Sequence, residues 1–341
     1  MSIWGSSSNR SPKAAAALWK LAALAVLMLL CALLGLCAGA SGVDLPQVLK
    51  ELLAGEAASA QSRIFLYVRW PRVCAAMLSG AALAVSGMLI QAVLGNALAS
   101  PNVIGVNAGA GFFTFLAMAV LPGVRGAAPA GAFIGALLAV LIVCGVAAGA
   151  GSGKLTIILA GVAVSSIFTA GINTVKTFFP DTLYNGSTFL IGGFSGVSVR
   201  DLSPAWGVIL AALGVAWLLA GQADLLCLGE ESARTLGVHV GRSRFLLILV
   251  ACVLAGCAVS FAGLLSFVGL LAPHIVRRLL GEAKTGHRIL LPAAACFGAA
   301  FVTLCDLLSR VLFAPYEIPV GILLSFVGGP FFLFLIIKKR A

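Results

Sequence analysis

A glycine-rich stretch that ends in a lysine is the first place in this sequence that could carry chemistry. Residues 149–156 read GAGSGKLT, which resembles a loop that cradles phosphate groups. A Walker loop needs a glycine separated by four residues from its Gly-Lys pair, and a Ser or Thr directly after the lysine. This chain has Ala148 and Leu155 at those two positions. We therefore predict a tight turn here and no ATPase site in this chain.

Ionisable side chains inside apolar stretches could couple transport to ions or protons, because such residues mark coupling paths in membranes. Asp306 is the main candidate, but it lies four residues before Arg310 on the same helix face, which favours a structural ion pair. Carboxylates are scarce within the apolar stretches, so an ion-coupled secondary transporter is a weak alternative. The spans also lack a HExxH, GxSG or paired-aspartate pattern, which argues against an intramembrane enzyme.

The long charged connection at about 222–243 mixes acidic and basic residues with apolar residues at helical spacing. This pattern predicts one or two short amphipathic helices, with Glu230 and Arg234 paired at i,i+4. The adjacent acids Glu230 and Glu231 argue against docking to an anionic membrane surface. An interfacial helix that lies on lipid and a docking surface for a soluble partner are the two alternatives.

Arginines gather next to two other apolar stretches. The run RWPR at residues 69–72 precedes one stretch, where Pro71 is placed to begin a helix. Arg310 ends another stretch. The cluster is either an interfacial anchor or a basic surface that receives an acidic partner outside the membrane.

The connection at 180–195 is too apolar for a free loop. It predicts a short helix that folds back into the outer mouth of the bundle. Phe194 and the two glycines before it could line or gate a pore there.

The elements that hold these residues belong to a membrane-embedded helical bundle. Of the 341 residues, 61% are hydrophobic and 10% are charged, against about 45–50% and about 25% in soluble domains. This composition excludes a soluble enzyme, a nucleic-acid-binding protein and a disordered chain. The fold class is therefore an all-α polytopic membrane protein, which we predict to form a single domain over residues 1–341.

Ten apolar stretches approach the roughly 20 residues that a spanning helix needs. Lysine and arginine concentrate on the side of the N-terminus, so the positive-inside rule places both termini in the cytoplasm, with a short cytoplasmic tail over residues 1–14. The net charge of +11 is then mainly topogenic, and the nine cysteines are small buried hydrophobes rather than disulfides or metal ligands. The ten stretches are residues 15–38, 72–94, 101–121, 127–150, 155–179, 203–221, 243–260, 264–280, 289–309 and 317–337.

The order of several motifs resembles the FecCD-type permeases of ABC importers, from about residue 60 to the C-terminus. Two departures are Ala97, where the family has proline, and Trp70, where it has leucine. The matching segments are RWPR (69–72), the block at 80–111, LAGVAVSS (159–166), LGEESARTLGV (228–238), AGLLSFVGLLAPHIVRRLLG (262–281), HRILLP (287–292) and the closing Asp306, Arg310 and 317–321.

This resemblance implies a type II ABC importer permease fold of ten helices that works as a pair around a central pathway. The cargo it implies is an iron complex, a ferric siderophore before haem, with cobalamin as the alternative. It also implies that this chain binds no cofactor itself, because two partner ATPases bind ATP and magnesium. They would dock on the segment that contains Glu230, Glu231, Ala233, Arg234, Leu236 and Gly237.

The same resemblance assigns three further groups of residues and the remaining partners. These partners are an extracytoplasmic binding protein, membrane lipid and a second permease, with a homodimer favoured over a paralogue and no nucleic acid, in the inner membrane of a bacterium. The binding protein would dock on Arg69, Arg72 and Arg310. The cytoplasmic gate would contain Asn96, Ala97, Leu98, Ser152, Gly153 and Lys154, and the pathway would be lined by Ser165, Thr169, Asn173 and Phe194.

Overall fold

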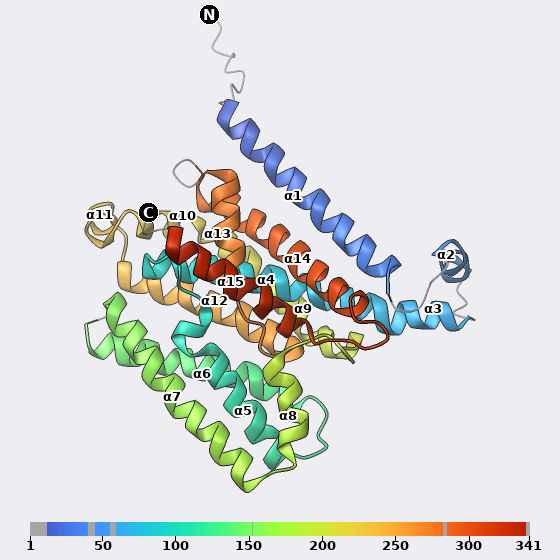
Figure 1. Cartoon of the computed structure of the whole chain (residues 1–341). Helices are drawn as coiled ribbons and strands as arrows, with labels where there is room; N and C mark the ends of the chain where they lie inside the picture. The colour runs from blue at the N-terminus through green and yellow to red at the C-terminus, as the bar shows by residue number, and fades with distance from the viewer. Residues whose placement is uncertain (1–11, 40–44, 55–58, 152, 282–284, 339–341) are drawn as a thin grey trace, which may run out of the picture.

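The computed structural model describes residues 12–39, 45–54, 59–151, 153–281 and 285–338, and all regular structure in these ranges is helical (Figure 1). Within these ranges, seven helical stretches are long and apolar enough to cross a membrane. The elements are α1 (Pro12–Cys37), α2 (Leu45–Leu53), α3 (Ala60–Ile64), η1 (Phe65–Arg69), α4 (Trp70–Leu94), η2 (Pro101–Ile104), α5 (Val106–Val120), α6 (Ala127–Gly149), α7 (Lys154–Phe178), α8 (Thr182–Ile191), α9 (Val199–Leu218), α10 (Ala220–Cys227), α11 (Glu230–Thr235), α12 (Val240–Ala262), α13 (Val268–Leu280), α14 (His287–Val311) and α15 (Val320–Lys338).

Each of the ten predicted spans coincides with a helix, which confirms the helical membrane-protein class. Three of these helices are short for a full crossing. α5 has 15 residues and α13 has 13. The apolar part of α15, Val320–Leu335, is also short. The number of crossings therefore stays a prediction.

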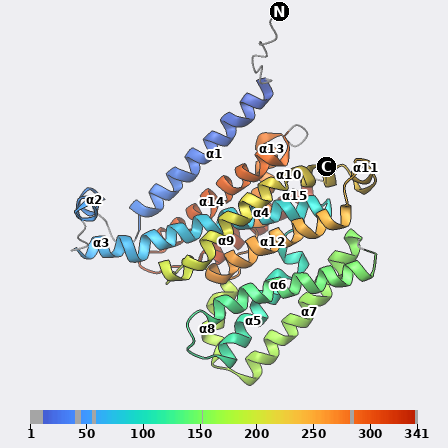
Figure 2. The ribbon, with the colours of Figure 1, turned by 180° about the vertical axis from the view of Figure 1, so that it is seen from behind.

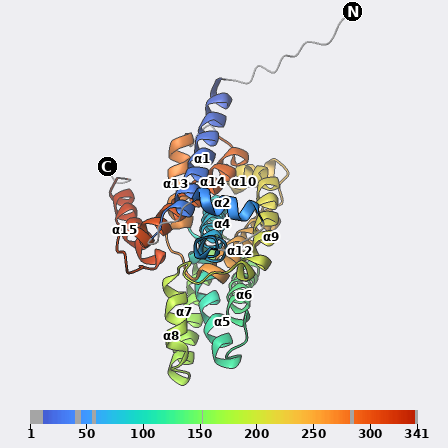
Figure 3. The same cartoon turned by 90° about the vertical axis from the view of Figure 1, so that its right-hand side faces the viewer.

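α4 is the central helix of the bundle. It packs against α9, α12, α13 and α14, and α1 lies along α14 on the outside (Figures 1 and 2). Helices α5–α8 form a second group that joins α12 mainly through α6. The end-on view in Figure 3 places this group together, with α15 and α9 on opposite edges.

Glycines let the central helices approach each other until their backbones touch. A Cβ atom built on Gly87 of α4 would lie 1.7 Å from the carbonyl oxygen of Gly269 in α13. A Cβ built on Gly80 would lie 2.2 Å from the carbonyl oxygen of Gly298 in α14. Small residues let the backbones of membrane helices approach closely, and the resulting packing contributes to helix association. These crossings therefore fix α4 within the bundle.

We expect Gly87→Ala to lower the melting temperature of the purified chain strongly and to reduce the yield of monodisperse protein. The added methyl group meets backbone, which has no rotamer by which to move away, so the cost reaches or exceeds the roughly 1–3 kcal/mol of ordinary overpacking. Thermal denaturation and size-exclusion chromatography measure this effect.

The matched control is Gly145→Ala in α6, where nothing lies within 4 Å of the new methyl group. This variant should melt at or slightly above the wild-type temperature, because alanine favours a helix more than glycine does. Equal melting temperatures for the two variants would contradict the backbone contact at Gly87.

The helix that contains Pro71 begins earlier than we predicted. A span starting at residue 72 was expected, but the helical stretch is continuous from Ala60 to Leu94. Its turn at Phe65–Arg69 is π-helical, and the Trp70 N–H bonds to the carbonyl oxygen of Phe65. A proline has no N–H and its ring clashes with the preceding turn of a helix. A wider π turn before the proline allows the helix to continue. Pro71 thus stands in the first turn of α4, as predicted, and the π turn before it continues the helical stretch back to Ala60.

Candidate functional site

The connection between α9 and α12 forms two short helices, as predicted. α10 packs against α4, α12 and α14, whereas α11 projects from that end of the bundle (Figure 1). Ala233 is fully buried beneath α11. Glu231 is exposed on the other side, and Leu228 and Leu236 keep 62% and 60% of their surface exposed. The segment thus presents apolar and acidic side chains outward.

Glu230 is turned toward the protein. Its carboxylate accepts a hydrogen bond from Arg244 near the start of α12, and Arg234 Nη2 lies 3.8 Å from its other oxygen. The second contact confirms the predicted i,i+4 pair. The bond from Arg244 is the main reason that the pKa of Glu230 lies below its usual value, and the charge of Lys154 contributes. This carboxylate therefore stays ionised at neutral pH.

The two predicted gate turns lie next to each other. Gly95 ends α4 in the left-handed conformation, and Lys154 Nζ lies 2.7 Å from the place where a Cβ of residue 95 would be. Only glycine tolerates that conformation freely, and its missing side chain leaves room for the lysine.

The turn that contains Ala97 is held by a side-chain hydrogen bond. The N–H of Leu98 donates to Asn96 Oδ1 over 3.0 Å, as in an Asx turn. The turn thus has a stabilising contact without the proline of the family pattern. Gly153 and Lys154 are half-buried beside it, and Ser152 lies outside the described residues.

At the opposite end of the bundle, a buried acid joins two arginines. Asp306 lies 3.0 Å from Arg72 Nε and 3.2 Å from Arg310 Nη2, which confirms the predicted Asp306–Arg310 pair. Arg72 Nη1 also contacts Glu317 at 2.7 Å. Asp306 has no exposed surface, whereas the Glu317 side chain is 41% exposed. Glu317 is therefore the accessible member of this cluster.

Arg69 binds backbone carbonyl groups at the end of α1. Its Nη1 donates to the carbonyl oxygens of Leu36 and Cys37 over 2.9 and 2.8 Å. A basic side chain at that position satisfies carbonyls that a helix C-terminus leaves unpaired. Arg69, Arg72 and Arg310 are 4%, 7% and 4% exposed, so they form no open basic surface in this conformation.

Three of the four predicted pathway residues form a stripe on α7. Ser165, Thr169 and Asn173 follow one another at intervals of four, which puts them on one helix face. Thr169 and Asn173 are exposed, Ser165 is half-buried, and the Thr169 hydroxyl donates to the Ser165 carbonyl over 2.8 Å. Phe194 does not join this stripe, because its side chain is 1% exposed and packs in the core.

α8 is the short helix predicted within 180–195, and its end is tied to two other segments. The Gly193 N–H donates to the carbonyl oxygen of Ala262, and the Leu264 N–H donates to that of Phe189. A Cβ on Gly321 would lie 1.8 Å from the Ile191 carbonyl oxygen, so α15 begins against the end of α8.

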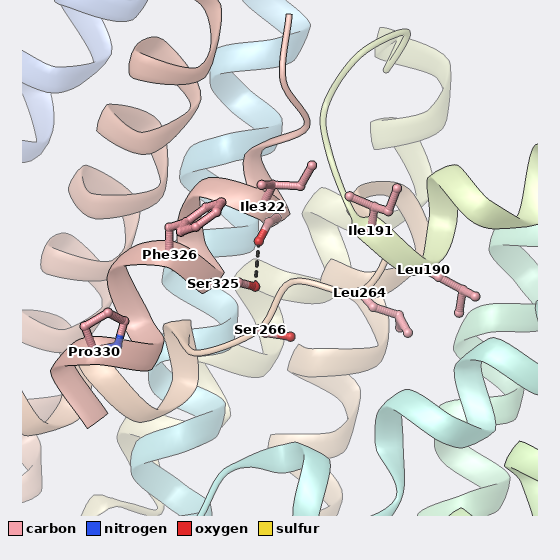
Figure 4. Close-up of a pocket in the computed structure, with 9 residues that line it drawn as sticks. Leu190, Ile191, Leu264, Ser266, Ile322, Ser325, Phe326 and Pro330 are labelled. Atoms are coloured by element: carbon pink, nitrogen blue, oxygen red, sulfur yellow. Dashed lines mark hydrogen bonds between the residues drawn. The ribbon is translucent and has the colours of Figure 1, made fainter. Parts of the chain in front are cut away.

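A cavity of about 470 Å³ opens beside this junction (Figure 4). Its wall is mostly apolar, with the hydroxyls of Ser266 and Ser325 as polar groups, and the Ser325 hydroxyl donates to the Gly321 carbonyl over 2.9 Å. Sequence reasoning missed these residues, because they come from three segments that only the fold brings together. The lining residues are Leu190, Ile191, Leu264, Ser266, Gly321, Ile322, Ser325, Phe326 and Pro330.

Comparisons with known proteins agree over almost the whole chain. Residues 27–338 match the FecCD transport family. The chain is 36% identical to the Fe(3+)-citrate import system permease protein YfmD of Bacillus subtilis over 90% of this chain and 91% of that protein. It is 36% identical to the hemin transport system permease protein HmuU of Yersinia pestis over 81% and 84% of the two chains.

Two further similarities extend this agreement. The chain is 35% identical to the ferric enterobactin transport system permease protein FepG of Escherichia coli, over 89% of this chain and 91% of that protein. The fold superposes on an inward-facing structure of a metal-chelate type ABC transporter with a TM-score of 0.81 and 28% identity, over 93% of this chain and 98% of that chain.

Proposed function

This chain belongs to the FecCD transport family and is a membrane-spanning permease of an ABC importer, and we propose that its cargo is a ferric complex. The match to that family over residues 27–338 is the observation that carries the proposal. The relatives named above import ferric citrate, ferric enterobactin and hemin. They favour a ferric siderophore or citrate complex, with haem next, over the cobalamin alternative.

We place the energy source in two partner ATPases that bind ATP and magnesium. The segment formed by α11 and its two flanks supports this assignment, because Glu231, Leu228 and Leu236 offer an exposed mixed surface at one end of the bundle. Apolar anchors surrounded by polar groups are typical of protein interfaces. That end, with both chain termini, would face the cytoplasm of a bacterium, and the bundle would lie in its inner membrane.

The α7 stripe supports a pathway between two copies of the permease. An exposed Asn173 would be costly against lipid, because polar groups in a membrane normally face a bundle interior or a water-filled cavity. A second copy that faces α7 would enclose Ser165, Thr169 and Asn173 in such a path.

We expect the double variant Thr169→Val and Asn173→Leu to lower uptake of the ferric complex by about tenfold while leaving ATPase association unchanged. These substitutions remove the polar lining that would replace water around a passing solute. Uptake by proteoliposomes of the full transporter measures the effect. The control is Ile167→Val on the same helix, and loss of uptake there as well would contradict a specific role for the stripe.

Arg69, Arg72 and Arg310 remain our proposed docking residues for an extracytoplasmic binding protein. Because they are buried, an acid of that protein would have to replace an internal partner. Glu317 is the group to be replaced, since it is half-exposed and holds Arg72 from the outside. Opposite charges at such a rim favour association and fix its register.

The experiment that tests the function is an uptake assay with defined cargo. The full transporter, with its ATPases and binding protein, is reconstituted and given iron-labelled ferric citrate, a ferric hydroxamate, hemin or cobalamin. We expect ATP-dependent uptake of at least one iron complex and none of cobalamin. Uptake that follows a proton gradient in vesicles without ATPases would contradict the proposal.

A further inference from the structure

Glu230 and its neighbour Glu231 lie in different surroundings. Glu231 is exposed on α11, whereas Glu230 binds the Arg244 side chain, which is only 4% exposed. The Glu230 side chain is itself 35% exposed, so it bridges the surface and the protein interior. Because the Glu230 carboxylate is already paired with Arg244, it contributes little to a surface that binds the ATPase.

Two arginines from two different helices contact Glu230. Arg234 belongs to α11 itself, and Arg244 is the fifth residue of α12. The charge of Lys154 is close enough to help hold the pKa of Glu230 down. Glu230 therefore joins α11 to α12 by direct contact, with the positive charge of Lys154 nearby.

Lys154 extends this cluster to the end of α4. Its ammonium group lies against Gly95, directly before the turn at 96–98. A cation beside a helix C-terminus is stabilised by the unpaired carbonyl groups and the helix dipole. Contacts thus lead from α11 through Glu230 to Arg244 of α12, which lines one pocket with Ile157 of α7. Lys154, at the start of α7, then reaches the end of α4.

Arg244 is only 4% exposed, so its charge stays desolvated when Glu230 is separated from it, and such a separation is costly. A displacement of α11 that separated Glu230 from Arg244 would carry that cost. It is more favourable for the start of α12 to move together with α11, and that start shares a pocket wall with Ile157 of α7.

We infer that Glu230 is a positioning residue that ties α11 to the turns at 95–98 and 153–154, and not a contact to the ATPase. This inference rests on the proposed function, because it takes α11 as the ATPase-docking segment. It divides the two adjacent acids: Glu231 acts in assembly, and Glu230 acts in the transmission of movement to the gate.

The test compares Glu230→Gln with Glu231→Gln in the full transporter reconstituted in proteoliposomes. We expect Glu230→Gln to keep ATPase association within about twofold, while uptake per ATP hydrolysed falls by about tenfold. Glu231→Gln should show the opposite pattern. The exchange of Glu230→Arg with Arg244→Glu should restore part of the lost uptake per ATP, because it rebuilds the pair with reversed charges.

A second readout needs no cargo and so separates this inference from the proposed function. Asn96→Cys is introduced together with Cys227→Ser, because Cys227 is the exposed cysteine among the described residues. The labelling rate of the new thiol by a water-soluble maleimide is measured with and without ATP and vanadate. We expect a nucleotide-dependent rate in this background, and loss of that dependence when Glu230→Gln is added.

The outcomes are decisive in either direction. If Glu230→Gln does not fold, Lys154→Gln replaces it, because that change keeps the Glu230–Arg244 pair intact, and the same loss of nucleotide dependence is expected. If both variants keep the nucleotide-dependent labelling and the wild-type uptake per ATP, the inference is wrong. If the wild type imports no ferric complex but its labelling responds to nucleotide through Glu230, the proposed cargo fails and the inference stands.

Discussion

Replacing Asp306 by asparagine should destabilise the folded chain by about 3–5 kcal/mol, the usual cost of leaving a buried ion pair without one partner. Asp306 has no exposed surface and is the only acid in the described residues that contacts both Arg72 and Arg310. Its loss leaves two guanidinium groups that are less than 10% exposed, with a single half-exposed acid for Arg72. Thermal denaturation of the purified full chain measures the change, and size-exclusion chromatography reports the folded fraction.

Glu317→Gln is the matched control for Asp306→Asn. It also removes an acid from Arg72, but that acid is 41% exposed, and Arg72 keeps its contact with Asp306. Because Asp306 still compensates Arg72 and the lost acid is partly solvated, the cost should stay near the roughly 0–1 kcal/mol of exposed pairs. The melting temperature should therefore change little. Equal melting temperatures for the two variants would show that the buried acid is not the structural centre of this cluster.

The second large effect is expected at α11, where Leu236→Glu should weaken association with the partner ATPases by at least about 30-fold. Leu236 is 60% exposed at the end of a helix that contributes only Ala233 to the core. An apolar side chain left so open at a docking surface has the character of an interface anchor, and loss of such an anchor typically costs about 2 kcal/mol or more. Titration of the purified permease with the ATPase measures the affinity.

Val124→Glu provides the control for Leu236→Glu. Val124 is 56% exposed, and it lies between α5 and α6, away from α11 (Figure 1). The same new charge at that place should leave the ATPase affinity unchanged. If Leu236→Glu assembles with wild-type affinity, α11 is not the docking segment, and the ATPases must bind elsewhere on the chain.

The sequence by itself determined the class of the protein and the helices that compose it. Long apolar runs have one stable form in a membrane, because a helix satisfies its own backbone hydrogen bonds. The apolar character of the connection at 180–195 was sufficient for α8. Local spacing was sufficient for the two helices at about 222–243 and for the pairs Asp306–Arg310 and Glu230–Arg234, since helical periodicity fixes which residues share a face.

The tertiary structure alone decided which partners those residues have across the fold. Arg72 meets Asp306 and Glu317 across 234 and 245 residues of chain, and no local pattern predicts such a meeting. Lys154 reaches Gly95 only because the end of α4 and the start of α7 lie together.

Phe194 shows why hydropathy could not predict which apolar residues lie in the core. It was expected to line the pathway, but the structure buries it in the core. In a membrane protein the residues that face lipid are as apolar as those that face the interior, so hydrophobicity does not distinguish the two environments. Helices and local pairs follow from the sequence because their contacts are near in the chain, whereas core, cavity and charge clusters depend on how the helices pack.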